Sequence, residues 1–130
     1  MIFINQIMTI IKSIRFVDAA IFMGAPVMGI ILTLDYDRLS EINWIDFGTY
    51  FIAIYILAIH VFLINDWGDY IRDLNDTNKT NGLIPTASKK ELVIISLMSG
   101  LISLILLFLH SFESFFVGVL IIILSTIYST

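Results

Sequence analysis

The chain is poor in several residue types that soluble proteins use freely. It has no cysteine among its 130 residues, which excludes a disulfide framework and a thiolate metal site and leaves the redox compartment open. Only 14% of its residues are charged, with seven lysines and arginines against 11 aspartates and glutamates. The basic residues form no patch of the kind that binds nucleic acid. These absences argue against a disulfide-stabilised domain and a nucleic-acid-binding protein.

Apolar residues, by contrast, make up 58% of the chain, which is more than a soluble domain of this length could bury. Composition therefore places the protein in the membrane class. Four apolar runs predict membrane helices at approximately residues 16–34, 47–66, 92–109 and 114–127. Within the first run Pro26 is expected to kink the helix. A polar link over residues 35–46, a loop over residues 74–88 and a short turn over residues 110–113 connect them.

The first residues of the chain carry apolar side chains at helical spacing, from Phe3 to Ile14. They predict a short amphipathic helix on the membrane surface, although they are also consistent with the start of the first membrane helix. The fold class that we predict is all-α. It is a multi-pass transmembrane bundle of about four helices with an N-terminal interfacial helix, in one domain over residues 1–130.

The basic residues predict the orientation of this bundle. With four spans, six of the seven lysines and arginines fall on one side of the membrane and only Arg38 on the other. Because positive residues stay in the cytoplasm, both ends of the chain and the loop over residues 74–88 are expected to be cytoplasmic. We therefore expect an integral, multi-pass protein of the cell membrane with its functional face on the cytoplasmic side.

The second apolar run ends in the sequence Asn65-Asp66-Trp67-Gly68-Asp69-Tyr70-Ile71-Arg72-Asp73, which places three carboxylates within nine positions. On a helix, Asn65, Asp66, Asp69 and Asp73 fall within an arc of roughly 100°. Acids that merely face water need no such phasing, and acids aimed at one point usually bind a cation. Hard oxygen ligands suit Mg²⁺ or Mn²⁺, with phosphate oxygens completing the shell of Mg²⁺. The motif thus indicates a metal-diphosphate site at a membrane surface.

The pattern N-D-x-x-D-x-x-x-D resembles the first aspartate-rich motif of the UbiA-type intramembrane prenyltransferases, which also lies at the cytoplasmic end of their second membrane helix. The resemblance implies that Asn65, Asp66, Asp69 and Asp73 bind Mg²⁺, which holds the diphosphate of a polyprenyl donor in the membrane. It assigns the catalytic role to Asp66 and Asp69. Asn65 and Asp73 would bind substrate, together with Lys79. The acceptor in this family is lipophilic and often aromatic.

The chain departs from that family in two respects. The family's segment R-P-L-P-S-G corresponds to residues 82–87, where its diphosphate-binding arginine is missing. Lys79 is either a substitute for that arginine or an ordinary cytoplasmic surface lysine. The family's second motif, D-x-x-x-D, does not occur after Asp73. We therefore expect this chain to be the N-terminal half of a longer bundle and to be catalytically inactive alone.

Three alternative interpretations remain. The motif could be a solvated acidic helix end, or a cation-binding cluster in a non-enzymatic membrane protein or transporter fragment. A lipid-head-group transferase of the CDP-alcohol type would need a D-G-x-x-A-R run, which Asp66-Trp67-Gly68 does not supply. The two histidines are weak candidates. His60 points away from the carboxylates and is expected to be packed or hydrogen-bonded, and His110 is expected to be solvated at the outer interface.

Overall fold

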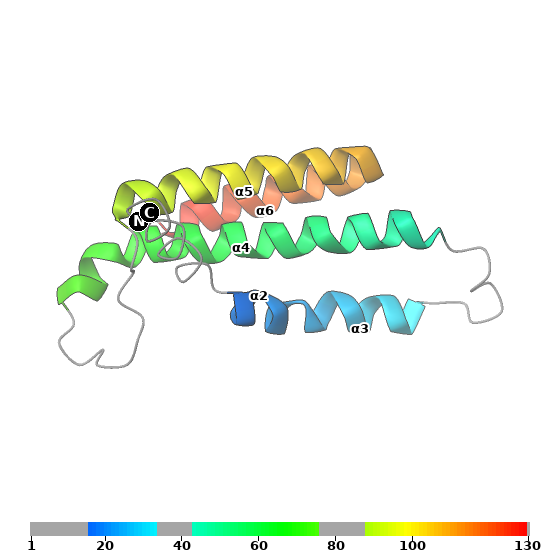
Figure 1. Ribbon diagram of the computed structural model, residues 1–130, viewed down its shortest axis with the longest axis horizontal. Helices are drawn as coiled ribbons and strands as arrows, with labels where there is room; N and C mark the ends of the chain where they lie inside the picture. The colour runs from blue at the N-terminus through cyan, green and yellow to red at the C-terminus, as the bar shows by residue number, and fades with distance from the viewer. Residues whose placement is uncertain (1–15, 34–42, 76–87, 130) are drawn as a thin grey trace, which may run out of the picture.

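The fold consists of helices throughout the part of the chain that the computed structural model describes, which is residues 16–33, 43–75 and 88–129 (Figure 1). The helices, in chain order, are α2 (Phe16–Phe22), α3 (Gly24–Thr33), α4 (Trp44–Asn75), α5 (Lys89–His110) and α6 (Phe112–Ser129). These segments contain no strand, and the predicted all-α class is confirmed. The predicted interfacial helix over residues 1–15 lies outside the described residues.

Three helices are long and apolar enough to cross a membrane: 27 residues of α4 from Trp44 to Tyr70, the 22 residues of α5 and the 18 residues of α6. At a rise of about 1.5 Å per residue, the length of α5 is about 33 Å, close to the thickness of a bilayer core. Large apolar side chains such as Leu101 and Phe116 are exposed along these helices. In water such exposure would be unfavourable, so these faces are suited to lipid.

The first predicted membrane helix is interrupted and forms a shorter, bent apolar segment, α2 followed by α3. The break falls at Met23, whose amide donates to the carbonyl groups of Ala19 at 3.1 Å and of Ala20 at 3.2 Å. Pro26 explains its position, because a proline cannot donate to the carbonyl four residues earlier and its ring clashes with that group. That residue is Phe22, the last residue of α2. The predicted kink is therefore found at Met23, three residues upstream of the proline itself.

The other helix boundaries agree with the sequence to within a few residues. The link predicted to reach Asp46 ends earlier, because α4 begins at Trp44. Asn43 starts this helix by accepting hydrogen bonds through Oδ1 from the amides of Ile45 at 3.2 Å and Asp46 at 3.4 Å. The predicted extension of this helix through Asp73 is confirmed, since α4 continues to Asn75. At the other end of the bundle, only Ser111 separates α5 from α6.

Helix α4 lies at the centre, in contact with α2, α5 and α6 (Figure 1). One buried cluster joins Ala19 of α2 to Leu63 of α4 and Leu92 of α5. A second cluster joins Leu57 of α4 to Leu107 of α5. Helix α4 runs antiparallel to α5 and to the α2–α3 segment, and parallel to α6 (Figure 1). Its motif-bearing end therefore lies beside the start of α5 and the end of α6.

His60 connects α4 to α5 inside the bundle. Its side chain is 2% exposed, and its Nδ1 lies 2.8 Å from the carbonyl oxygen of Ser96 and 3.0 Å from the Ser96 hydroxyl. A carbonyl can only accept, so Nδ1 donates to it, and Nε2 is buried with no hydrogen-bond partner among the described residues. The expectation of a packed, hydrogen-bonded histidine is confirmed, and the ring lies directly against Gly100.

Candidate functional site

The acidic motif occupies the last turns of α4 at the end of the bundle where α5 begins and α6 ends. Two contacts hold this end together. The Nζ of Lys89 lies 5.1 Å from the centre of the Trp67 ring, a cation–π contact between α5 and α4. The backbone of Gly68 approaches the backbone carbonyl of Ser129 so closely that a side chain at position 68 would overlap it. The motif is therefore packed against the ends of both neighbouring helices.

Within the motif, the side chains of Asn65, Asp66 and Asp69 are all half-buried. The Nδ2 of Asn65 donates a hydrogen bond of 3.5 Å to Oδ2 of Asp69, one helical turn further on. Asp73 belongs to the final part of α4, but its side chain lies outside the described atoms, as does the whole of Lys79. The structure thus brings Asn65 and Asp69 together and leaves the roles of Asp73 and Lys79 as predictions.

The donor atoms of this end of α4 have the chemistry that Mg²⁺ requires. Because Asn65 uses its amide nitrogen toward Asp69, its amide oxygen is the atom that could bind a cation. The carboxylates of Asp66 and Asp69 supply further hard oxygen donors. Among the described side chains no group of three or more Asp, Glu, His or Cys residues is placed to hold a metal. A cation here would therefore take some of its ligands from elsewhere, as Mg²⁺ commonly does from water and phosphate oxygens.

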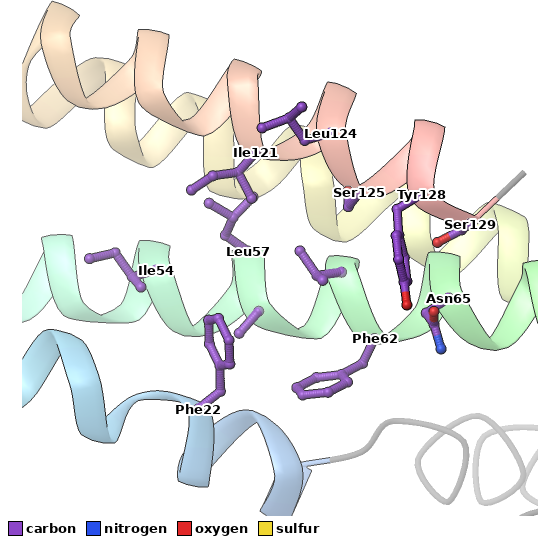
Figure 2. Close-up of a pocket in the computed structure, with 12 residues that line it drawn as sticks. Phe22, Ile54, Leu57, Phe62, Asn65, Ile121, Leu124, Ser125, Tyr128 and Ser129 are labelled. Carbon is purple, nitrogen blue, oxygen red and sulfur yellow. The ribbon is translucent and has the colours of Figure 1, made fainter.

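A cavity of about 590 Å³ begins beside the motif and lies between α2, α4 and α6 (Figure 2). Its lining includes Asn65 of the motif and is otherwise largely apolar. The lining residues are Phe22, Ile54, Leu57, Ala58, Val61, Phe62, Asn65, Ile121, Leu124, Ser125, Tyr128 and Ser129. The positions from α4 recur every three or four residues, so they form one face of that helix. Continued by one turn, the same face reaches Asp69.

The two ends of this cavity differ in polarity. Figure 2 shows Asn65, Tyr128 and Ser129 gathered at one end, while Ile54 and Ile121 lie toward the other. The polar end includes Asn65 of the acidic motif, and the apolar remainder extends along the part of α4 that is long and apolar enough to cross a membrane. Such a cavity suits an elongated amphiphile with a polar head and a hydrocarbon tail.

The residues of α6 that line the cavity were not among the sequence-predicted site residues. The signal was present, because Ile121, Leu124, Ser125 and Tyr128 recur at helical spacing with polar members only toward the end of the helix. It was inconspicuous because an apolar membrane helix presents apolar residues on every face, so periodicity does not mark one of them.

The histidines take no part in this site. His60 faces α5, away from the cavity lining. His110 is exposed, as expected, and stacks on Tyr50 with ring centres 4.5 Å apart at the opposite end of α5. Comparison with known proteins adds no relative: no family model, curated protein or solved structure matches this chain.

Proposed function

We propose that this chain forms the donor-binding part of a membrane prenyltransferase, which transfers a polyprenyl group from its diphosphate to a lipophilic, often aromatic acceptor. The observation that carries the proposal is the apolar cavity that ends at Asn65. The tail of the donor would lie among the side chains of α4 and α6, and its diphosphate would lie at the acidic motif. The proposal also uses the resemblance of residues 65–73 to the UbiA-type motif.

In this proposal Asn65, Asp66 and Asp69 hold Mg²⁺, and Asp73 joins them from the next turn of α4. When bound, Mg²⁺ offsets the charge of the diphosphate and makes it a better leaving group. Lys79 would contact the diphosphate from the loop that follows. Asp66 and Asp69 are the residues on which catalysis depends most, because their carboxylates position that charge.

The residues of the cavity have a separate task, which is to bind the tail and exclude water. Apolar side chains such as Leu57, Val61 and Leu124 keep water from the reactive carbon. At the polar end, the hydroxyl groups of Tyr128 and Ser129 can donate hydrogen bonds to diphosphate oxygens. The Tyr128 side chain is largely exposed, so it is accessible to such a ligand.

The proposed transfer needs no reactant other than the donor and the acceptor. The bond between C1 of the prenyl group and oxygen breaks, and the diphosphate leaves with the electron pair. Ring electrons of an aromatic acceptor form the new bond to C1. The ring then loses one proton from the attacked carbon, and an oxygen of the released diphosphate can accept it.

Equilibrium binding of radiolabelled farnesyl diphosphate to the chain in lipid nanodiscs tests this proposal without requiring turnover. We expect Mg²⁺ to strengthen binding and EDTA to abolish the increase. Asp66→Asn and Asp69→Asn should each weaken Mg²⁺-dependent binding about tenfold, the loss expected when a charge-bearing contact is removed. Asp46→Asn is the matched control, because it makes the same change in the first turn of α4, far from the motif.

Unchanged binding in both motif variants would refute the site. If the chain instead binds Mg²⁺ equally well with and without farnesyl diphosphate, and binds the diphosphate no better with the metal, the alternative of a cation-binding membrane protein takes its place.

A further inference from the structure

Four phenylalanine rings form a connected group around the turn between α5 and α6, at the end of the bundle opposite the acidic motif (Figure 1). Phe115 meets Phe108 of α5 edge to face, with ring centres 5.6 Å apart and planes at 79°. Phe112 lies beside Phe115, with ring centres 6.3 Å apart, and beside Phe116, at 6.2 Å. The side chains of Phe108, Phe112 and Phe116 are each more than half exposed. These four residues form what we call the phenylalanine patch.

The position of the phenylalanine patch along the helices corresponds to the edge of a bilayer. All four residues lie within five positions of Ser111, which separates α5 from α6. With α5 across a bilayer core, this turn lies at the level of the lipid head groups. Tryptophan and tyrosine are the aromatic residues usually enriched at this depth, because each has a polar group that can meet water. Phenylalanine has no such group, so the patch offers only the π systems of its rings.

The charge beside the phenylalanine patch is negative. Glu113 directly follows Phe112, and on a helix it shares a face with Phe116, three residues further on. The Glu113 side chain is exposed. Both lysines of the described chain, Lys89 and Lys90, lie at the other end of α5. Because the face of an aromatic ring attracts cations, the rings and the carboxylate favour a ligand of the same sign.

The polar groups of the patch restrict the kind of cation. A primary ammonium is strongly hydrated and has three N–H donors, whereas the patch has the single carboxylate of Glu113 to accept them. A quaternary ammonium has no N–H donor, and its methyl groups can contact aromatic faces directly, which makes it a favoured cation–π ligand. In a bilayer such a group is the choline head group of a phospholipid.

We propose that the phenylalanine patch and Glu113 bind the choline head group of a phospholipid in the leaflet at this end of the bundle. The acyl chains would lie along the exposed side chains of Leu120 and Ile123, which continue the face of Phe116 along α6. The bound lipid would hold the turn between α5 and α6 at the bilayer edge. This site shares no residue with the proposed donor cavity, so the proposal does not depend on the prenyltransferase function.

Native mass spectrometry of the chain in detergent, titrated with lipids that carry identical dioleoyl tails, tests the proposal. The two main probes are phosphatidylcholine and its carbon isostere, in which a tert-butyl group replaces the trimethylammonium group. They have the same shape, but only the first carries the positive charge. We expect phosphatidylcholine to bind about tenfold more tightly than the isostere, as contacts of a cation with more than one exposed ring allow. Phosphatidylethanolamine should bind more weakly than phosphatidylcholine, and free choline at the same concentration should not displace the lipid.

Variants locate the preference for the cation on the patch. Phe116→Leu keeps an apolar side chain but removes the ring, and it should lower the preference about threefold. Phe116→Trp should keep or increase the preference, since tryptophan is the best cation–π partner. Glu113→Gln should lower it, and Glu113→Asp should keep most of it. Asp46→Asn is the control, because it removes a carboxylate from another helix at the same end of the bundle and should leave the preference unchanged.

Four outcomes would overturn the proposal. Equal binding of phosphatidylcholine and its isostere would show that the charge of the head group is not recognised. An unchanged preference in both Phe116→Leu and Glu113→Gln would place the lipid elsewhere. The same loss in Asp46→Asn as in Glu113→Gln would reduce the effect to a general attraction by the acidic end. Tighter binding of phosphatidylethanolamine, or displacement of the lipid by free choline, would assign the surface to a different ligand.

Discussion

Gly68, Gly100 and Gly118 each lie close to a neighbouring helix, and the atom that an added side chain would meet is different for each. A methyl group at Gly68 would overlap the backbone carbonyl of Ser129. At Gly100 it would lie 2.9 Å from Nδ1 of His60, a ring held in place by its bond to Ser96. At Gly118 it would lie 2.6 Å from Cδ1 of Leu107, the end of a flexible side chain. The ease with which each neighbour can move should therefore decide the cost of an added side chain.

The prediction is an order of stabilities for alanine variants. Gly118→Ala should cost less than about 1 kcal/mol, and Gly100→Ala about 1–3 kcal/mol, the usual cost of overpacking. Gly68→Ala should be the most destabilising, because a backbone cannot rotate away. Gly48→Ala, with nothing within 4 Å, serves as the control and should be neutral or slightly stabilising. Thermal unfolding of the variants in detergent, followed by circular dichroism, would measure the order, and equal midpoints for all four would contradict it.

At the scale of the element, the start of α5 is defined by a reciprocal cap. The Ser88 side chain accepts from the amide of Glu91 at 3.3 Å, and the Glu91 carboxylate accepts from the amide of Ser88 at 2.7 Å. This capping box satisfies amides that the first turn of a helix leaves unpaired. Ser88 is the N-cap residue, so α5 begins at Lys89, whose side chain lies over Trp67 of the motif. The cap therefore helps to place the cation–π contact beside the candidate site.

Ser88→Ala should loosen the first turn of α5 without affecting the rest of the helix. Loss of an N-cap serine typically costs about 1 kcal/mol, which corresponds to roughly fivefold faster amide exchange in that turn. Hydrogen exchange of a peptide covering residues 88–93 would measure it. Ser111→Ala provides the comparison, because Ser111 accepts from the amide of Ser114 at the start of α6 and should leave the exchange of residues 88–93 unchanged. Faster exchange along all of α5 would show that the effect is not a local cap.

At the scale of the whole molecule, the ends of the three long helices lie on two opposite sides of the bundle. The motif, Lys89, Lys90 and Ser129 share one end of the bundle, and Asn43 and the turn at Ser111 share the other. The basic residues predict that the motif end is cytoplasmic. Because the sequence contains no cysteine, single cysteine variants can report this orientation without background.

In intact cells, Glu113→Cys should react with a membrane-impermeant maleimide, and Lys90→Cys should react only after the membrane is permeabilised. Both side chains are exposed, so access to the reagent and not burial decides the result. The opposite pattern would reverse the orientation and place the candidate site on the outer face. Labelling of both positions in intact cells would contradict the arrangement of α5 as a membrane-spanning helix.

Much of the helical organisation follows from local sequence alone. The lengths of the apolar runs predicted α4, α5 and α6, because a helix in a membrane must satisfy its own backbone hydrogen bonds whatever surrounds it. The kink was also local in origin, since Pro26 disrupts a bond within its own helix. The phasing of Asn65 and Asp69 was predictable for the same reason, because residues four apart meet on any helix.

The cavity depended on tertiary structure. Asn65 becomes the polar end of a cavity only because α6 returns to the motif, and Tyr128 lies 63 positions later in the chain. Phe22 lines this cavity only because α2 packs on α4, where its ring meets that of Phe62. Local sequence determined which segments are helices and which face of α4 carries the acids, because those properties repeat along one helix. The packing of the helices decided which side chains face one another, because that depends on close contacts such as the one between Gly68 and Ser129.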